Sequence, residues 1–539
     1  MSSKTLNLIV NNVKLPTDAS IQEAFSVSES KLRRAGIKFS APEFKIYRKS
    51  IDARMKNDIK FVYSVLVSAE FSNVNSHTLA AAGAAIDKSE IPTPRFGNEL
   101  LDGRPVVVGS GPCGLFCALM LAENGYAPIL LERGGSVAER IAEIERFKTT
   151  RKLNVNTNIQ FGAGGAGTFS DGKLITRIND GMSLYVLNKF VEFGASEEIL
   201  YQAKPHIGTD VLCVIVDRLI KRIEQLGGEV RFHTTFLGAD FKSRHISEII
   251  TDNGRIHAGA LVLAIGHSAR DTYETLISSN IAIEPKNFSV GMRIEHLCET
   301  IDKGMYGNMA GDKNLGHAEY ALSYNTKQRG VYTFCMCPGG EVVAATSENG
   351  GVVVNGMSES RRDGRNSNSA VVCSIFREDY GNDPLAAIEF QRKIERAAFA
   401  AGGNDYSAPI ITFGDFKEGK LSREPKSVLP TYMNGEGVKL ASPYDYLPGI
   451  VCDSIKNAIF DFDRKIHGFA DCDAVLTGAE TRTSAPLRIL RDDKTRLALG
   501  YSNFYPAGEG AGYAGGITSA AIDGIRTALA LMEKYKSKS

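Results

Sequence analysis

The glycine turn at residues 109–114 constrains the fold of this chain more than any other stretch. A β-branched run, Val106 to Val108, precedes it, and apolar residues at helical spacing follow it from Leu115 to Ala122. A second apolar run, Ile129 to Leu131, then ends in the acidic residue Glu132. Strand, glycine turn, helix, strand and acid in this order are typical of a dinucleotide-binding βαβ unit. The sequence therefore predicts a Rossmann-like α/β domain around this unit.

Each glycine of this Gly-x-Gly-x-x-Gly turn has an expected role. Gly109 allows a tight turn, Gly111 lets the backbone approach a pyrophosphate, and Gly114 lets helix and strand pack closely. Free N–H groups at the positive end of the helix favour the pyrophosphate, and Glu132 can accept hydrogen bonds from both ribose hydroxyls. A glycine-rich turn without a ligand is the alternative.

A second glycine turn lies close to the C-terminus, at residues 508–516, and again leads from an apolar run into a helix of small residues. Two helix N-termini suit a ligand with two polar ends. One end takes the pyrophosphate, and the other could point its dipole at the N1/O2 edge of a flavin, where negative charge develops on reduction. This pair of turns favours FAD over NAD, with a simple turn at 508–516 as the alternative.

A third glycine-rich run covers residues 162–173 and contains five glycines. So many glycines leave little side chain to pack, so we expect the backbone to press against something flat or highly charged. Ser170, Asp171 and Lys173 supply the polar groups nearby. A plain flexible loop is the alternative.

Residues 1–95 are predicted to form a separate small α+β domain with a ferredoxin-like arrangement. Leu6 to Val10 indicates a strand, Ile21 to Ala35 a helix, and Phe44 to Tyr47 and Phe61 to Phe71 two further strands.

The overall charge balance excludes a generally basic protein. Lys plus Arg number 63 against 62 for Asp plus Glu, so the net charge is +1 and nothing global indicates nucleic acid or an anionic membrane. Residues 31–60 are locally basic, with ten Lys or Arg against three Asp or Glu. This stretch could recruit RNA or an acidic partner, and a solvated charged face is the alternative.

Targeting and metal signals are missing from the sequence. No apolar stretch approaches the roughly 18 to 20 residues of a membrane span, and the N-terminus lacks the apolar core of a secretory signal. The nine cysteines are scattered, without pairs at metal-ligand spacing. We therefore expect a cytoplasmic protein with no membrane span and no metal site.

Five motifs together carry a resemblance to a known family. They lie at residues 109–114, 162–173, 204–210, 478–484 and 508–516. In combination they resemble the poorly characterised bacterial family of FAD-dependent dehydrogenases, and more distantly the flavoproteins labelled BaiN-like or aminoacetone oxidase. The resemblance extends over nearly the whole chain and supplies no substrate.

The resemblance implies an α/β fold with a Rossmann-like FAD-binding domain of the glutathione-reductase kind. Residues 96–284 and 481–539 would form the two parts of this domain, and residues 285–480 an inserted α+β substrate or cap domain. The small ferredoxin-like domain of residues 1–95 would precede them.

The resemblance also implies which residues bind the cofactor. The pyrophosphate and ribose would lie on the first glycine turn and Glu132, the flavin on the glycine-rich run and the last turn, and the adenine near Thr235 and Phe236. The expected FAD contacts are Gly109, Ser110, Gly111, Pro112, Cys113, Gly114, Glu132, Arg133, Gly164, Gly165, Thr168, Ser170, Asp171, Lys173, Phe236, Gly266, Gly508, Glu509, Gly515, Gly516 and Ile517.

Catalytic candidates come from side chains that carry protons or bind anions. His206 is the expected acid or base, because an unshifted histidine titrates at about pH 6.5. Arg293 and Arg482, with Arg488, could clamp a substrate carboxylate. A packing histidine and ordinary salt bridges are the alternatives.

Two cysteine pairs invite a redox interpretation. Cys335 and Cys337 are one residue apart, and on a regular strand they would share a face with strained disulfide geometry. Cys113 and Cys117 would be helix neighbours that simply pack. The sequence therefore favours packing roles over a catalytic dithiol at either pair.

The expected function is an FAD-dependent oxidoreductase that transfers a hydride between flavin N5 and an unidentified small-molecule substrate. The sequence has no second Gly-x-Gly-x-x-Gly in a strand–helix context, so electrons would come from the substrate, from transiently bound NAD(P)H or from a protein donor. Two alternatives stay open: a flavin-dependent tRNA-modifying enzyme that uses residues 31–60, and a flavin-binding sensor or scaffold without turnover.

Overall fold

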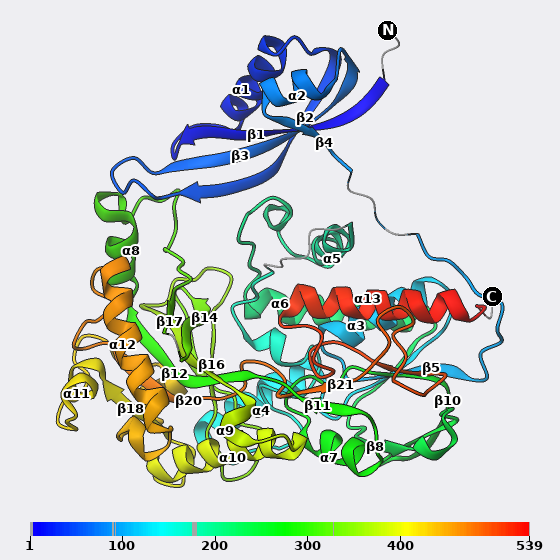
Figure 1. The fold of residues 1–539 in the computed structure, drawn as a ribbon, viewed down its shortest axis with the longest axis vertical. Helices are drawn as coiled ribbons and strands as arrows, with labels where there is room; N and C mark the ends of the chain where they lie inside the picture. Colours follow the sequence, from blue (N-terminus) through cyan, green and yellow to red (C-terminus); the bar gives the residue numbers. More distant parts are fainter. Residues whose placement is uncertain (1–3, 89–90, 92, 175–180, 327, 538–539) are drawn as a thin grey trace.

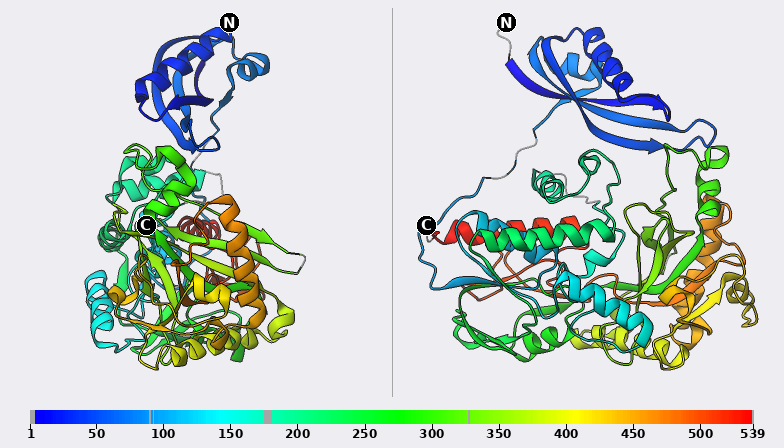
Figure 2. Two further views of the ribbon diagram at one scale, coloured as in Figure 1. Left: turned by 90° about the vertical axis from the view of Figure 1, so that its left-hand side faces the viewer. Right: turned by 180° about the vertical axis from the view of Figure 1, so that it is seen from behind.

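The computed structural model of the chain describes residues 4–88, 91, 93–174, 181–326 and 328–537. Three parts are visible in Figures 1 and 2: a small N-terminal sheet at one end of the molecule, and two larger sheets side by side beneath it. The chain is a mixed α/β protein, as the sequence predicts.

The N-terminal part has the element order βαββαβ. Its sheet has the order β2-β3-β1-β4, and all neighbouring strands are antiparallel. This is the topology of the ferredoxin-like fold. The elements are β1 (Lys4–Pro16), α1 (Ile21–Arg34), β2 (Lys38–Asp52), β3 (Lys60–Ser72), α2 (Ser76–Ala82) and β4 (Ala84–Ile86).

The basic stretch 31–60 contributes contacts that attach this part to the rest of the chain. The Lys49 backbone N–H donates to the Tyr201 carbonyl at 2.7 Å, and its carbonyl accepts from Ala203 at 2.8 Å. The Lys56 ammonium donates to the Gly304 carbonyl at 2.6 Å. Some of the local positive charge therefore serves docking within the chain.

The second sheet contains the predicted βαβ unit. Its parallel strands run in the order β7-β6-β5-β10-β22, and β9 and β8 extend it antiparallel to the start of β10. The strands are β5 (Arg104–Val108), β6 (Ile129–Leu131), β7 (Glu229–Arg231), β8 (Phe236–Ala239), β9 (Glu248–Thr251), β10 (Gly254–Leu263) and β22 (Phe504–Pro506).

Helix α3 is the centre of the layer that covers this sheet. Every residue from Cys113 to Ala122 is buried, because α6 and α13 pack against it on the side away from the sheet (Figure 1). The helices around the sheet are α3 (Pro112–Glu123), α4 (Val137–Thr150), α5 (Gly181–Glu192), α6 (Thr209–Gln225), α7 (Arg270–Ser278) and α13 (Ile517–Lys534).

The third part is a largely antiparallel sheet in the order β13-β14-β17-β12-β20-β18-β19. Its strands are β12 (Phe288–Leu297), β13 (Ser323–Asn325), β14 (Gly330–Cys337), β17 (Asn366–Ile375), β18 (Ala408–Thr412), β19 (Val438–Leu440) and β20 (Val475–Glu480). A two-stranded ribbon, β15 (Glu341–Ala344) and β16 (Val354–Met357), lies beside it. A second ribbon, β11 (Ile283–Pro285) and β21 (Leu487–Ile489), pairs the chain entering this part with the chain leaving it.

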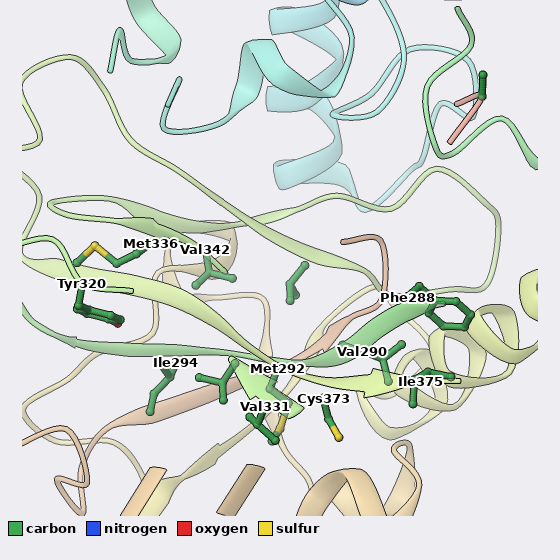
Figure 3. Close-up of a cluster of buried hydrophobic side chains, with 14 of the residues drawn as sticks. Phe288, Val290, Met292, Ile294, Tyr320, Val331, Met336, Val342, Cys373 and Ile375 are labelled. Carbon is green, nitrogen blue, oxygen red and sulfur yellow. The ribbon is translucent and has the colours of Figure 1, made fainter. Parts of the chain in front are cut away.

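The two central strands of the third part, β12 and β17, are buried along nearly their whole length. Apolar side chains on both faces of the sheet form its core, among them Val290, Met292, Ile294, Val331 and Met336 (Figure 3). Its helices are α8 (Cys298–Tyr306), α9 (Arg377–Tyr380), α10 (Pro384–Ala401), α11 (Phe413–Glu418) and α12 (Gly449–Lys465). Among the described residues, no helix has both the length and the apolar character to cross a membrane.

Candidate functional site

One cavity lies between the second and third sheets and collects residues from distant parts of the sequence. Its walls include both predicted glycine turns, the glycine-rich run, and the strands β14, β16 and β20. The residues predicted from the sequence that line it are Gly109, Gly111, Pro112, Cys113, Glu132, Arg133, Gly165, Ser170, Lys173, Phe236, Gly266, Arg482, Glu509, Gly515, Gly516 and Ile517.

Two helix N-termini open into this cavity. Gly111 is the N-cap of α3 and Gly516 is the N-cap of α13, and neither glycine has a side chain that could satisfy the free N–H groups of its first turn. A Cβ built at Gly515 or Gly266 would meet no described atom within 4 Å, so the backbone there borders open space. Two uncapped, positively polarised helix ends on one cavity suit an elongated anionic ligand.

Each of the three runs contains a glycine that close packing requires. A Cβ at Gly114 would lie 1.8 Å from the Gly109 carbonyl oxygen, and one at Gly165 would lie 2.9 Å from the Gly111 Cα. A Cβ at Gly508 would lie 2.7 Å from the Cβ of Cys113. The three glycine segments are therefore in direct contact, although about 400 residues separate the first from the last in sequence.

Glu132 ties the first turn to the glycine-rich run. Its carboxylate accepts hydrogen bonds from the Ser110 N–H at 3.0 Å and the Ser110 hydroxyl at 2.7 Å, and from the N–H groups of Gly134 at 2.9 Å and Gly162 at 3.0 Å. It also lines the cavity. Glu132 therefore shapes the turn in addition to its predicted contact with a ribose, which stays a prediction.

The buried guanidinium of Arg140 on α4 shapes the glycine-rich run, a role that the sequence analysis missed. It donates to the carbonyls of Asn158 at 2.8 Å, Ile159 at 2.7 Å and Ala163 at 2.7 Å. These hydrogen bonds hold the chain at the start of the glycine-rich run, from Asn158 to Ala163.

Several predicted cofactor contacts are not among the residues that line the cavity. They are Ser110, Gly114, Gly164, Thr168, Asp171 and Gly508. The predicted flavin contact of Asp171 stays a prediction, and its fully buried carboxylate accepts hydrogen bonds from Arg362 and Ser358. The guanidinium Nε of Arg362 lies 3.0 Å from Asp171, so the pair neutralises itself inside the protein.

The structure gives no support to His206 as the acid or base, which stays a prediction. His206 is not among the residues that line the cavity. Burial, with a smaller contribution from Arg362, lowers its pKa to about 4. A histidine with this pKa is neutral near pH 7 and cannot deliver a proton there.

The predicted arginine clamp stays a prediction, and each of its guanidinium groups has an acidic neighbour within the chain. Arg482 donates to Glu395 at 3.0 Å. Arg488 lies 3.8 Å from Glu284. Arg482 still reaches the cavity wall, but its charge is matched by a buried carboxylate.

Arg293 lies behind the cavity, where it supports the end of β14. It donates to the Cys335 carbonyl at 2.7 Å and to the Asn355 side chain at 3.3 Å. Its Nε is 3.3 Å from Glu480 Oε2, but the two atoms are not aligned for a hydrogen bond. Arg293 is thus a structural support for residues that do line the cavity.

Two carboxyl groups on the cavity wall titrate near neutral pH. Burial raises the pKa of Glu480 to about 7, against a lowering effect of Arg293. Burial likewise raises the pKa of Glu509 to about 7, against a lowering effect of Lys286. Within the described chain, Glu480 Oε2 has no hydrogen-bond partner. The sequence analysis missed Glu480 as an acid or base, although it lies within the 478–484 motif.

His267 is a further cavity residue that the sequence analysis missed. Its Nδ1 lies 2.9 Å from the Ser268 hydroxyl, and burial beside Arg482 and Arg270 lowers its pKa to about 3. It is therefore a neutral hydrogen-bonding group. Its position directly after Gly266, at the end of β10, was the available signal.

The cavity fits FAD by the chemistry of its walls. Uncapped helix ends can hold a pyrophosphate, glycine surfaces can lie against a flat ring, and Glu132 can accept from a ribose. Among the described residues, no group of three or more His, Cys, Asp and Glu side chains could hold a metal ion.

Comparisons with known proteins agree with this fit. Residues 287–483 match a family described as "FAD-dependent protein, C-terminal domain-like", and residues 9–68 match a domain of unknown function. An uncharacterized protein from Clostridium beijerinckii is 43% identical over 530 residues, which cover 98% of either chain.

The chain matches solved structures only at low similarity. Glycine oxidase from Bacillus cereus is 9% identical, with a TM-score of 0.31 over 80% of this chain and 95% of its own. L-amino acid deaminase from Proteus vulgaris is 12% identical, with a TM-score of 0.32 over 84% of this chain and 98% of its own.

Proposed function

The chain belongs to a family of FAD-dependent proteins, and on this premise we propose that it is an oxidoreductase that transfers a hydride between flavin N5 and a small-molecule substrate. Its cofactor is FAD. The observation that carries the proposal is the convergence of two uncapped helix N-termini and the ends of β14, β16 and β20 on one cavity.

We propose that the N–H groups at the start of α3 hold the pyrophosphate and that Glu132 holds the adenosine ribose. The N-terminus of α13, with Gly515 and Gly516, would face the pyrimidine edge of the flavin, where its dipole favours the anionic reduced form. When bound, FAD supplies the two-electron chemistry of hydride transfer.

The substrate would occupy the part of the cavity formed by the third sheet. Phe334, Asn355, Glu480 and Thr483 line this part. We assign proton transfer to Glu480, because it lines the cavity and has a pKa of about 7 although Arg293 lies 3.3 Å from its Oε2. A group that titrates near the working pH is best suited to general acid–base catalysis.

This assignment favours a division of the chain into an FAD-binding part, residues 96–284 and 481–539, and an inserted substrate part, residues 285–480. The antiparallel pairing of β11 with β21 at the junction supports this division. The N-terminal residues 1–95 would form the third unit.

The proposal is tested by purification of the full chain and measurement of its visible spectrum, followed by anaerobic reduction with NADH, NADPH and candidate substrates. We expect a yellow protein that releases FAD on denaturation and is bleached by one of these donors. A colourless protein that takes up no added FAD would refute the proposal.

A further inference from the structure

The segment Phe334-Cys-Met-Cys at the end of β14 forms part of the cavity wall, and the mechanism above leaves it unused. Phe334 and Cys335 line the cavity, whereas Met336 packs into the core of the third sheet (Figure 3). Cys337 is fully buried directly behind this wall. A pair of thiols therefore lies at the point where the substrate and the flavin are expected to meet.

The local backbone overturns the objection that the sequence analysis raised against this pair. Pairing of β14 with β17 shifts register between Phe334 and Cys337, and Cys335 has φ +46°, in the left-handed region. The regular alternation of a strand is therefore broken at Cys335. The strained strand geometry expected for two cysteines one residue apart does not apply here.

The Cys337 thiol donates to the Cys335 carbonyl at 3.2 Å, and the two thiols differ in acidity. Hydrogen bonding with the Cys337 side chain, with the charges of Arg293 and Lys173, holds the pKa of Cys335 below its usual value although burial opposes it. The same hydrogen bonding and burial raise the pKa of Cys337. The arrangement stabilises one thiolate beside one thiol, and the thiolate is the reactive form of a cysteine.

Arg293 holds this turn in place. Its guanidinium donates to the Cys335 carbonyl at 2.7 Å and is itself completely buried. Because Arg293 belongs to β12 and its Nε lies 3.3 Å from Glu480 Oε2, it links the position of Cys335 to both β12 and Glu480. Arg293 is a positioning residue for the thiol pair.

We propose that Cys335 and Cys337 form a redox-active dithiol–disulfide pair that exchanges an electron pair with FAD, an inference that rests on the proposed function. In the oxidising direction the Cys335 thiolate and the Cys337 thiol form one S–S bond while the single S–H bond, that of Cys337, breaks. The two electrons and this one proton pass to oxidised FAD, which is the oxidant. In the reverse direction, reduced FAD returns the electron pair and the disulfide opens. The pair thus stores a second electron pair beside the flavin.

The pair is tested in the FAD-loaded full chain by anaerobic titration with dithionite, together with alkylation and peptide mapping before and after reduction. Cys335→Ser and Cys337→Ser are the test variants, and Cys472→Ser, at an exposed cysteine outside the cavity, is the matched control. We expect the oxidised wild type and the control to accept one electron pair more per FAD than either test variant. Peptides with Cys335 and Cys337 should resist alkylation until the protein is reduced.

Equal electron uptake by wild type and both variants, with Cys335 and Cys337 alkylated in the oxidised protein, would overturn the proposal. Because peptide mapping needs only the wild type, a variant that fails to fold leaves the test intact. A chain that binds no FAD would instead refute the proposed function, and the dithionite titration would then show no flavin signal in any variant.

Discussion

A single methyl group added at Gly111 tests the cofactor site without disturbing the fold. Gly111 has φ −68° and ψ 177°, a conformation that alanine adopts freely. The atom nearest to a Cβ at this position would be the Cα of Gly165, at 3.9 Å, which is ordinary van der Waals contact. Because Gly111 is an N-cap, Gly111→Ala should cost at most about 1 kcal/mol of stability.

The same methyl group would stand where the pyrophosphate must approach the backbone. An extra methyl group in a well-packed site costs about 1–3 kcal/mol, and roughly 1.4 kcal/mol corresponds to a tenfold change in Kd. We therefore expect the Kd for FAD to rise by about 5- to 150-fold in Gly111→Ala. Titration of the FAD-free protein with FAD, followed by flavin fluorescence, measures this change.

Two further glycines serve as controls. Gly449→Ala places its Cβ in open space at the exposed start of α12, away from the cavity, and should leave FAD affinity unchanged. Gly114→Ala would place a Cβ 1.8 Å from the Gly109 carbonyl oxygen and should disrupt folding itself. If Gly111→Ala folds and binds FAD with wild-type affinity, the pyrophosphate does not lie on this turn and the assignment of the site is refuted.

Three other predictions follow from buried charges. In the pH profile of kcat, the wild type should show a group that titrates at about pH 7, and Glu480→Gln should lack it. An unchanged profile would exclude Glu480 as the proton carrier. Burial raises the pKa of Glu480 in the folded state, so its contribution to the stability of the wild type is present below its ordinary pKa of 4.5 and is lost as pH rises through about 7. The difference in Tm, Glu480→Gln minus wild type, should therefore increase between pH 4.5 and about pH 7. The kcat of His206→Gln at neutral pH should be within about twofold of the wild-type kcat, because a histidine with a pKa of about 4 is already neutral there. A large loss of kcat with an unchanged KM would instead identify His206 as a catalytic residue. Arg362→Met should cost about 3–5 kcal/mol in chemical denaturation, because it removes the nearest cation from the buried Asp171 carboxylate and leaves only Lys173, at 3.8 Å, to offset its charge. Asp171→Asn in the same chain should recover part of that loss.

The local pattern of the sequence predicted the elements that depend on neighbouring residues. The glycine turn at 109–114 forms the expected link between β5 and α3, and the helix predicted from Ile21 is α1. These predictions succeed because glycine conformation, apolar spacing and β-branched runs act over a few residues.

The chemistry of individual side chains was harder to predict. His206 carries the right type of side chain, yet burial away from the cavity removes its proton near neutral pH. Glu480 was not selected, because its pKa of about 7 arises only from burial within the folded chain. Arginines that could have bound a substrate are paired with Glu395 and Glu284 from distant segments.

The sequence by itself determined that two glycine-rich turns would each lead into a helix N-terminus, because such turns are encoded by residues that lie next to each other. Only the tertiary structure decided what surrounds them. It brings the 508–516 turn against Cys113, and it brings Glu480 and the Cys335 thiol to the same cavity. Burial and charge pairing depend on contacts between residues hundreds of positions apart, and those contacts set which side chains can carry a proton or an electron pair.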